Sequence, residues 1–343
     1  MSGHFAYIRE QSFGTWVTPT KWLPVDSMGV ASSRAKIELP VSGADRGIYL
    51  HVLGEKPVGG PLGHPWFPVN VASLIRTFMT NLTTTNVSTG VYDHAFLYDD
   101  TANLGSFCGQ KRYTPSLAQS FVGAMVNTFT LSVETKAAAH LAYALLCKDE
   151  VRNSGTWDYN GSAGPAVLAP SYPTVRRPLM FYDGAIAIGG TPTLDGTTKK
   201  LSLAGATTYT KISKVEIVMN HNLDADGYGI VQDPTVQELI PGGRRGEVSF
   251  EISWSDYAAT FYDAARAGTA MALSLDLVGP TLTGAYKYEG HALATSLFFD
   301  PVTLPEINSD SARKKLTLKG AMQTDPGAGV DFGLWIRTSE ATL

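Results

Sequence analysis

The feature that most constrains how this chain can fold is a repeated alternation of apolar and polar residues. In residues 247–254 every second side chain is large and apolar, and the others are Glu or Ser. Successive side chains of a β-strand point to opposite faces of a sheet, so such a segment buries one face and wets the other. The same alternation recurs in residues 128–133, 271–277, 315–319 and 332–336. The sequence therefore predicts a mainly β protein.

Two segments have helical periodicity instead. From Val71 to Leu82, apolar side chains recur at the spacing of one helical stripe, and Asn70 stands in the N-cap position. The second helix is expected to begin at the capping residue Ser255 and to end at Gly268. Residues 137–147 fit either a helix or one face of a strand, and the pattern leaves both open. The expected fold class is α+β, mainly β.

A loose internal repeat suggests that the chain holds two units. Ala35–Ser42 (AKIELPVS) and Lys214–His221 (KVEIVMNH) each precede a turn, a second strand, an amphipathic helix and another strand. We expect two tandem β-sandwich or barrel units, although any α+β domain can yield such a series. The expected division is an N-terminal arm over residues 1–34, a first unit over 35–150, a linker or long loop over 151–178 and a second unit over 179–343.

Three segments without periodicity are candidates for contact with a neighbour. His51–Pro68 and Asn153–Pro178 are rich in Gly and Pro, and long loops of this kind are often functional. The N-terminal arm contains Phe13, Trp16 and Trp22 in no repeating pattern. Aromatic residues are favoured interface anchors. Either the arm fills a groove on another copy, so that deleting residues 1–24 leaves a folded subunit, or it forms a strand on its own domain.

Charge and cysteine content argue against several classes of function. The chain has 27 basic and 31 acidic residues, whereas a nucleic-acid-binding chain carries a basic excess. Cys108 and Cys147 are too few for a disulfide framework and lack metal-site spacing, so we expect two buried free thiols. The first ten residues carry no apolar run, and residues 137–147 are too short to cross a bilayer. We expect no signal peptide and no membrane segment.

The motifs that superficially suggest chemistry are incomplete. In Gly105–Gly109 the Cys stands one residue too late for a nucleophile elbow, and Asp224–Gly229 lacks ligands of a calcium loop. Asp99-Asp100 is expected to be a turn, and Gly189–Gly196 a hairpin turn rather than a phosphate loop. Arg244-Arg245 is expected to cap a turn or pair across an interface. We therefore expect no enzyme, no catalytic, cofactor-binding or metal-binding residues, and no cofactor.

An ordered set of motifs resembles the major tail tube protein of long-tailed bacteriophages. The segments that carry the resemblance are Gln11–Pro24, Asn70–Leu82, Tyr92–Phe96, Asn127–Val133, Phe181–Ile188, Lys214–Leu223 and Gly242–Gly268. Their order covers nearly the whole chain. Residues 137–147 lie where that family has a strand, which favours a strand there. His51–Pro68 and Asn153–Pro178 depart from the family pattern.

The resemblance implies a fold and a structural role. Such proteins form β-sandwich or barrel-like units flanked by a helix, and inner strands of neighbouring subunits join around a lumen. Stacked rings form the tube of the virion tail, through which DNA passes without specific binding. Long members with two fused units form trimeric rings with pseudo-six-fold symmetry. The implied partners are the chain itself and the tape measure, tail terminator and tail tip proteins, with synthesis in the host bacterial cytoplasm.

Two other classes of protein remain open from the sequence. One is another phage structural protein, such as a capsid decoration or tail terminator subunit, which would not build tubes. The other is a carbohydrate-binding or adhesive β module, which would display an exposed aromatic platform.

Overall fold

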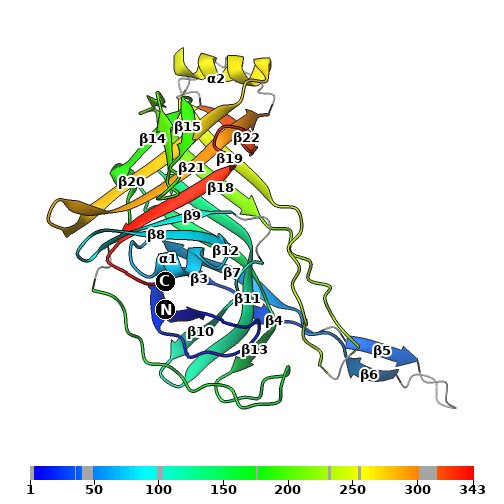
Figure 1. Ribbon diagram of the computed structural model, residues 1–343. Coiled ribbons are helices and arrows are strands. Elements are labelled where there is room, and N and C mark those ends of the chain that lie inside the picture. Colours follow the sequence, from blue (N-terminus) through cyan, green and yellow to red (C-terminus); the bar gives the residue numbers. More distant parts are fainter. Residues whose placement is uncertain are drawn as a thin grey trace.

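The computed structural model describes residues 4–34, 36–40, 49–98, 103–174, 177–230, 233–253, 256–300 and 315–343. Strands account for 54% of the described residues and helices for 6%, which confirms the mainly β fold. Figure 1 shows an elongated body with a helix at one end and a thin hairpin that projects from the other.

Within the described residues, the first half of the chain supplies thirteen strands and one short helix, α1 (Val71–Ile75). The strands are β1 (His4–Arg9), β2 (Lys21–Pro24), β3 (Ser27–Met28), β4 (Ala31–Ser32), β5 (Lys36–Pro40), β6 (Tyr49–Leu53), β7 (Val58–Pro65), β8 (Asn81–Ser88), β9 (Val91–Leu97), β10 (Phe107–Thr114), β11 (Leu117–Glu134), β12 (His140–Cys147) and β13 (Asp149–Arg152).

The second half supplies ten strands, a short 3-10 turn at Phe181–Asp183 and the helix α2 (Asp256–Ala267). The strands are β14 (Gly184–Ile188), β15 (Thr191–Leu194), β16 (Leu201–Ala204), β17 (Thr207–Thr208), β18 (Ile212–Asn220), β19 (Arg245–Ser253), β20 (Met271–Thr283), β21 (Tyr286–Phe299), β22 (Lys315–Met322) and β23 (Phe332–Thr338).

The strand pairings of the two halves follow the same succession. In the first half the antiparallel pairs are β1–β2, β1–β10, β10–β11, β11–β12, β11–β13, β12–β7 and β7 with β3 and β4. In the second half they are β14–β17, β14–β20, β20–β21, β21–β22, β21–β23, β22–β19 and β19–β18. Each pair of the first set has a counterpart in the second, in the same chain order.

Two further pairings join the halves. The second part of β11 pairs with β18, from Thr128 opposite Asn220 to Glu134 opposite Lys214. The hairpin β8–β9 has no counterpart in the second half, and β9 pairs with β23. As a result, nineteen of the strands belong to one sheet system, while β5–β6 and β15–β16 form separate hairpins.

The core lies on one face of the strand series β7–β12–β11–β18–β19–β22. The alternating residues identified in the sequence point into it, including Phe129, Val248, Phe250 and Leu318, all at most 1% exposed. The ring of Phe78 packs on Phe129 with centroids 4.7 Å apart. Burying a large apolar side chain contributes about 1.5–3 kcal/mol, so this face supplies much of the stabilising free energy.

The first helix is shorter than the sequence predicts. Only Val71–Ile75 is helical, and the chain turns before β8 begins at Asn81. Phe78 and Met79 are still fully buried, because the non-helical turn directs them into the same core. Asn70 stands at the N-cap position as predicted, but its backbone is left-handed and its side chain does not cap the helix, since it donates to the Trp22 carbonyl oxygen instead.

The second helix agrees with the sequence where the structure describes it. It spans Asp256–Ala267, and the predicted cap Ser255 lies outside the described residues, as does Trp254. Gly268 has φ +66°, and the Thr269 N–H donates to the Ala264 carbonyl, which ends the helix as expected. Phe261 packs against Phe250 with ring centroids 5.3 Å apart.

The expectations for the irregular segments had different outcomes. His51–Pro68 is not a long loop, because it contains the end of β6 and all of β7, whose glycines and prolines pair in register with β12. His140–Cys147 forms a strand, which confirms the choice that the resemblance favoured. Asn153–Pro178 has no regular strand or helix in its described part, as expected. Gly189–Gly196, expected to be a hairpin turn, contains the strand β15 (Thr191–Leu194), which pairs with β16 in a hairpin of its own.

The N-terminal residues are part of the sheet. β1 pairs along its whole length with β10, and Phe5, Tyr7 and Leu23 are fully buried. The expectation of a strand on its own domain is therefore confirmed, and the groove-filling arm over residues 1–24 is wrong. The expected equivalence of AKIELPVS and KVEIVMNH is also wrong, because Lys36–Pro40 forms β5 in the projecting hairpin, whereas β18 lies within the sheet.

The separation of core and outer faces gives a direct test of the fold. We expect Phe129→Ala to lower the free energy of unfolding by about 3–5 kcal/mol, because it leaves a cavity under Phe78. Thr130→Ala, one residue away on the opposite face, should change it by less than about 0.5 kcal/mol. Urea titration of both variants measures this, and equal losses would contradict the assigned faces.

Candidate functional site

The first candidate surface is the face of the β7–β12–β11–β18–β19–β22 series opposite the core, here called the polar face. Its described side chains are partly or fully exposed. They are Pro61, Pro65, Thr128, Thr130, Ser132, Glu134, His140, Ala142, Ala144, Lys214, Glu216, Val218, Asn220, Arg245, Glu247, Ser249, Glu251, Ser253, Thr317, Lys319 and Ala321. The face is built from two halves of the chain, because β11 and β18 meet in its middle.

The charges of the polar face are largely paired with one another. Lys214 Nζ lies 3.1 Å from Glu216 Oε2 on the same strand, and Lys319 Nζ lies 2.7 Å from Glu247 Oε2 on the neighbouring strand. The carboxylates of Glu216 and Glu247 raise the pKa of their respective lysines. Both lysines therefore remain cationic, and each has a carboxylate against it.

The second candidate surface is the hairpin β5–β6, here called the arm. It is distinct from the N-terminal residues 1–34 discussed above. Ile37 faces Val52 across its two strands, and these side chains are 47% and 43% exposed. Leu53 is 63% exposed. A projecting hairpin with apolar side chains in water has the character of a docking element, since single exposed apolar residues are common but a protruding group of them is not. Figure 1 shows the arm extending away from the body.

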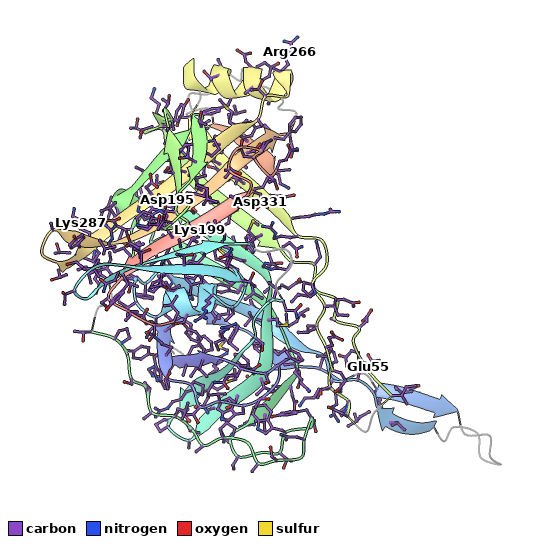
Figure 2. The ribbon with its side chains drawn as sticks, viewed as in Figure 1. Glu55, Asp195, Lys199, Arg266, Lys287 and Asp331 are labelled. Atoms are coloured by element: carbon purple, nitrogen blue, oxygen red, sulfur yellow. The ribbon has the colours of Figure 1, made fainter. Side chains whose placement is uncertain are left out.

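The base of the arm is fixed by an ion cluster in which Lys56 and Asp149 are buried and Asp158 is partly exposed. Lys56 Nζ donates to Asp149 Oδ1 at 2.5 Å, to Asp158 Oδ2 at 2.7 Å and to the Glu150 carbonyl at 2.9 Å. Burial alone would lower the pKa of Lys56, but the two carboxylates outweigh burial and raise it. Arg34 pairs with the same Asp158 at 3.0 Å. The arm therefore leaves the body from a rigid base, near the labelled Glu55 in Figure 2.

The connection between β18 and β19 runs toward the same side as the arm. In Figure 1 the yellow-green segment descends along the body to the base of β5–β6. The Lys56 N–H donates to the Pro234 carbonyl at 2.9 Å, and this bond joins the β18–β19 connection to the base of the arm. Leu223, Val236 and Leu239 are buried against Met125. Each half of the chain therefore contributes one extended segment to this end of the molecule: the arm from the first half and the β18–β19 connection from the second.

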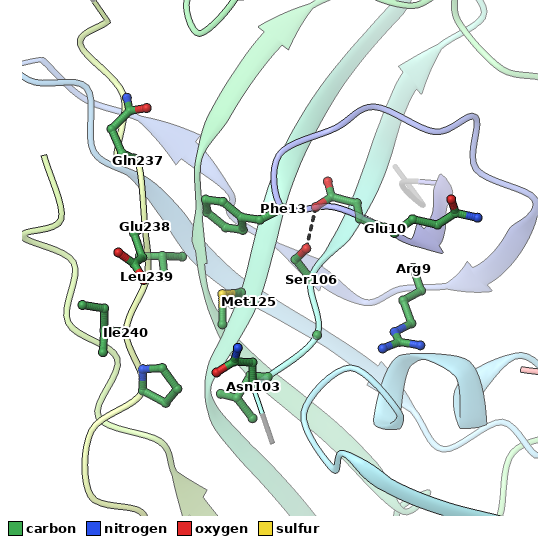
Figure 3. A pocket seen from close by; sticks show the side chains of 14 residues that line it. Arg9, Glu10, Phe13, Asn103, Ser106, Met125, Gln237, Glu238, Leu239 and Ile240 are labelled. Atoms are coloured by element: carbon green, nitrogen blue, oxygen red, sulfur yellow. Dashed lines mark hydrogen bonds between the residues drawn. The ribbon is translucent and has the colours of Figure 1, made fainter. Parts of the chain in front are cut away.

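A pocket of about 650 Å³ lies between the N-terminal segment, residues 103–106 and residues 237–241. Figure 3 shows Glu10 in it, with its carboxylate on Ser106. Glu10 accepts bonds from the Gly14 N–H at 2.9 Å, the Gly123 N–H at 2.7 Å and Ser106 Oγ at 2.6 Å. Burial outweighs these bonds and raises the pKa of Glu10. Both carboxylate oxygens are used internally, so this group orders the chain around it.

A buried ion network joins the hairpin β8–β9 to the second half. Asp93 Oδ1 accepts from Arg337 Nε at 2.7 Å and Asp93 Oδ2 from Arg337 Nη2 at 2.9 Å, while Lys200 bonds the same carboxylate. Arg337 also contacts Glu289 at 2.8 Å. Burial would raise the pKa of Asp93, but Arg337 and Lys200 outweigh it and lower the pKa. Figure 2 shows the neighbouring Lys199 and Asp195 on this side of the body.

The cysteines are as expected from the sequence. Cys108 and Cys147 are both buried free thiols. Burial raises the pKa of Cys108 to about 12 and raises the pKa of Cys147 further. Thiols held in this protonated state are poor nucleophiles.

The other motifs singled out in the sequence have structural roles where they are described. The Asp224 carboxylate accepts from the Asp226 N–H at 2.9 Å, as in a polar turn. Arg244 pairs with Asp331 at 3.0 Å and lies over the Tyr98 ring, so it pairs within the chain. Asp99 and Asp100 lie outside the described residues. Within the described ranges, no group of three or more His, Cys, Asp or Glu side chains could hold a metal ion.

The ion clusters at Lys56 and Asp93 were missed from the sequence. Arg337 and Asp93 are 244 positions apart, and no local pattern links them. The only signal was the placement of single charges inside otherwise apolar strands, as at Asp93 in Tyr92–Phe96.

The comparisons with known proteins agree with the sequence resemblance. A family model described as phage tail tube protein matches residues 2–323, nearly the whole chain. No curated protein gives a significant match. In the part of the chain that the structure describes, no helix is long and apolar enough to cross a membrane.

The Asp93 network gives a pH-dependent prediction. We expect Asp93→Asn to lower the free energy of unfolding at pH 7 by about 3–5 kcal/mol, because it leaves Arg337 and Lys200 without their buried carboxylate. The pKa of Asp93 is depressed in the folded state, so its contribution is complete above the unfolded value of about 4 and is lost as the pH falls below it. The difference between wild type and variant should therefore shrink in acid.

Denaturant titrations between neutral and acid pH measure this difference. Asp226→Asn, on an exposed loop, serves as the control and should change stability by less than about 0.5 kcal/mol at neutral pH. A wild-type advantage over Asp93→Asn that stays constant into acid would contradict the assigned linkage.

Proposed function

Since the chain belongs to the phage tail tube protein family, we propose that three copies close into a ring and that the rings stack into the tube. In this proposal each copy supplies two fused tube-fold units. The family places the chain in the virion tail as a structural protein. The proposed division is a first unit from β1 to β13 and a second unit from β14 to β23, with residues 153–178 between them.

The observation that carries the proposal is the repeated succession of strand pairs. Every pair from β1 to β13, apart from the additional hairpins, has a counterpart among β14 to β23. By this correspondence β18 takes the position of β3 and β4, and β21 that of β11. Two units with the same connectivity in one chain are what a pseudo-six-fold ring of three chains requires.

The joint between the two units supplies a template for ring closure. Within the chain, the edge of β18 is covered by β11 of the first unit over seven residue pairs. Strands β3 and β4 occupy the corresponding edge of the first unit and pair with β7. We propose that their other edge is covered by the second unit of a neighbouring copy. An edge that is paired in the assembly is no longer an aggregation hazard.

Stacking is assigned to the arm. Its exposed Ile37 and Val52 would be buried on the neighbouring ring, and the fixed base at Lys56 would hold the arm in one direction. The partners that complete the tail, namely the tape measure, terminator and tip proteins, would meet the same ring faces at the two ends of the tube. DNA would pass through the lumen without specific binding.

The competing functions have less support. Among the described residues, the exposed aromatic side chains of Tyr113, Tyr182 and Phe298 come from separate elements, whereas a carbohydrate-binding module would need them on one platform. A structural family and inert buried thiols support a protein without enzymatic activity.

Assembly of the purified chain tests the proposal. We expect concentrated protein to form tubes of uniform diameter in negative-stain micrographs, and dissociated rings to have the mass of three chains in native mass spectrometry. Rings of six chains would contradict the fused-unit proposal, and protein that stays monomeric under all conditions would contradict ring formation.

The role of the arm can be tested separately. We expect the double variant Ile37→Ser, Val52→Ser to fold normally but to raise the concentration needed for tubes at least about tenfold, because burial of about 2 kcal/mol per copy is lost. Lys36→Ser in the same hairpin is the matched control and should assemble like wild type. Circular dichroism checks the fold and sedimentation measures assembly, and tubes that form equally well in the double variant would exclude the arm from stacking.

A further inference from the structure

We infer that the polar face is the wall of the channel, and that Glu216 and Glu247 on it neutralise Lys214 and Lys319 so that duplex DNA is not held. This inference rests on the proposed function, since it assigns one surface of the chain to the lumen of the proposed tube. It names the residues that make a wall containing lysines non-adhesive to DNA.

The composition of the polar face distinguishes it from the rest of the surface. Its middle consists of small or hydroxyl side chains, with Thr128 opposite Ala144 and Thr130 opposite Ala142 on one side. On the other side, Thr130 lies opposite Val218 and Thr128 opposite Asn220. Short side chains of this kind leave these middle positions without aromatic rings on which bases could stack. The aromatic rings nearest to them are His140, opposite Ser132, and Phe298, opposite Ala321. The opposite face of the same strands is the apolar core, so only the polar face can meet water.

The two halves contribute differently to this wall. In the first half, the polar-face positions of β11 and β12 carry hydroxyl or alanine side chains, the carboxylate of Glu134 and the imidazole of His140, which contacts Asp26 at 2.8 Å. In the second half, β18, β19 and β22 carry the remaining charges. The described side chains of the polar face include four carboxylates (Glu134, Glu216, Glu247 and Glu251) and three cations (Lys214, Arg245 and Lys319). The wall is therefore mixed in sign with a slight acidic excess.

Lys214 is surrounded by carboxylates. Besides its contact with Glu216 at 3.1 Å, it lies in the field of Glu134 on β11 and Glu251 on β19, and all three favour its charged form. Register explains the grouping, because Lys214 lies directly opposite Glu134 on one neighbour and Glu251 on the other. A phosphate approaching Lys214 would meet three carboxylates at the same place.

Lys319 has a similar setting at the far end of the sheet. Its partner Glu247 lies diagonally across the β19–β22 pair at 2.7 Å, and Asp300 adds a further negative field. Strands are about 4.8 Å apart and rise about 3.4 Å per residue, so Lys214 and Lys319 are separated by about 10 Å across the strands and by about 7 Å along them. Without their glutamates, the two lysines would form a basic stripe that repeats around every ring.

The physical consequence follows from how proteins hold nucleic acid. Affinity for duplex DNA comes mainly from lysines and arginines that neutralise phosphates and release the counterions condensed on DNA. A lysine already paired with a carboxylate gains little by exchanging it for a phosphate, and the displaced carboxylate then repels the DNA. Both effects lower the affinity of the polar face for duplex DNA. The lysines meanwhile keep this surface hydrated and its net charge small.

The test removes the carboxylates and keeps the lysines. We expect the double variant Glu216→Gln, Glu247→Gln to bind a fluorescent 30-base-pair duplex, about one-fifth of the DNA persistence length, at least about tenfold more tightly than wild type. Binding is measured by anisotropy at about 50 mM salt and should weaken steeply as salt is raised. Wild type should show no measurable binding at physiological salt.

Two control variants distinguish an effect of the polar face from an effect of the net charge of the protein. Asp224→Asn, Asp226→Asn changes the net charge by the same amount on a loop away from the polar face, and should behave like wild type. The fourfold variant Lys214→Gln, Glu216→Gln, Glu247→Gln, Lys319→Gln leaves the face uncharged at these positions and should also fail to bind. Equal binding by the loop variant, or no gain in the first double variant, would overturn the inference.

Tube assembly by each variant is followed in the same samples. If wild type forms tubes but the double variant gains no DNA affinity, the wall assignment fails and the proposed function stands. If wild type forms no rings at all, the proposed function fails whatever the anisotropy shows.

Discussion

The structure depends most on the pairing between β11 and β18. β11 (Leu117–Glu134) is the longest strand of the chain and has neighbours along its whole length: β10 and β13 on its first part, β12 and β18 on its second. Since β12 and β18 both pair with Thr128–Ser132, they lie on opposite edges of β11. Together with the pairing of β9 and β23, the backbone bonds of this joint turn two separate strand groups into one sheet with one core.

This single joint accounts for the two faces of the molecule. Because strand side chains alternate, a register that buries Phe129 and Leu131 also buries Ile217 and Met219 of the partner strand. The same register brings Lys214 against Glu134 on the other face. A slip by one residue would send every apolar side chain to the polar face, so the core fixes the register and the register fixes the charge pairs.

The sequence was sufficient for the parts of the fold that have a local pattern. Alternation located β19 and β20, the glycine at position 268 located the end of α2, and the resemblance gave the family that the comparison confirmed. β7 was missed because its three glycines and two prolines favour a loop in isolation, and only pairing with β12 makes it a strand. The turn after α1 was missed because Phe78 and Met79 are buried equally well with or without a helix.

The candidate surfaces could be predicted only in part. The segments without periodicity, among them His51–Pro68, indicated contact with a neighbouring copy, but nothing local shows that Lys56 anchors the arm or that Asp93 bonds Arg337. Such contacts join positions far apart in the chain and depend on the complete sheet. The same holds for the polar face, whose lysines acquire their carboxylates from two neighbouring strands and from the other half of the chain.

The central claim is that the joint between the two halves is repeated between copies, and image reconstruction of assembled tubes tests it most directly. The account predicts a wall with six similar joints per ring, three within chains at β11 and β18 and three between chains at β3 and β4, so that the map has pseudo-six-fold symmetry at low resolution and three-fold symmetry at high resolution. A ring in which the second half lies outside the wall, leaving the polar face of β18 and β19 away from the lumen, would contradict it.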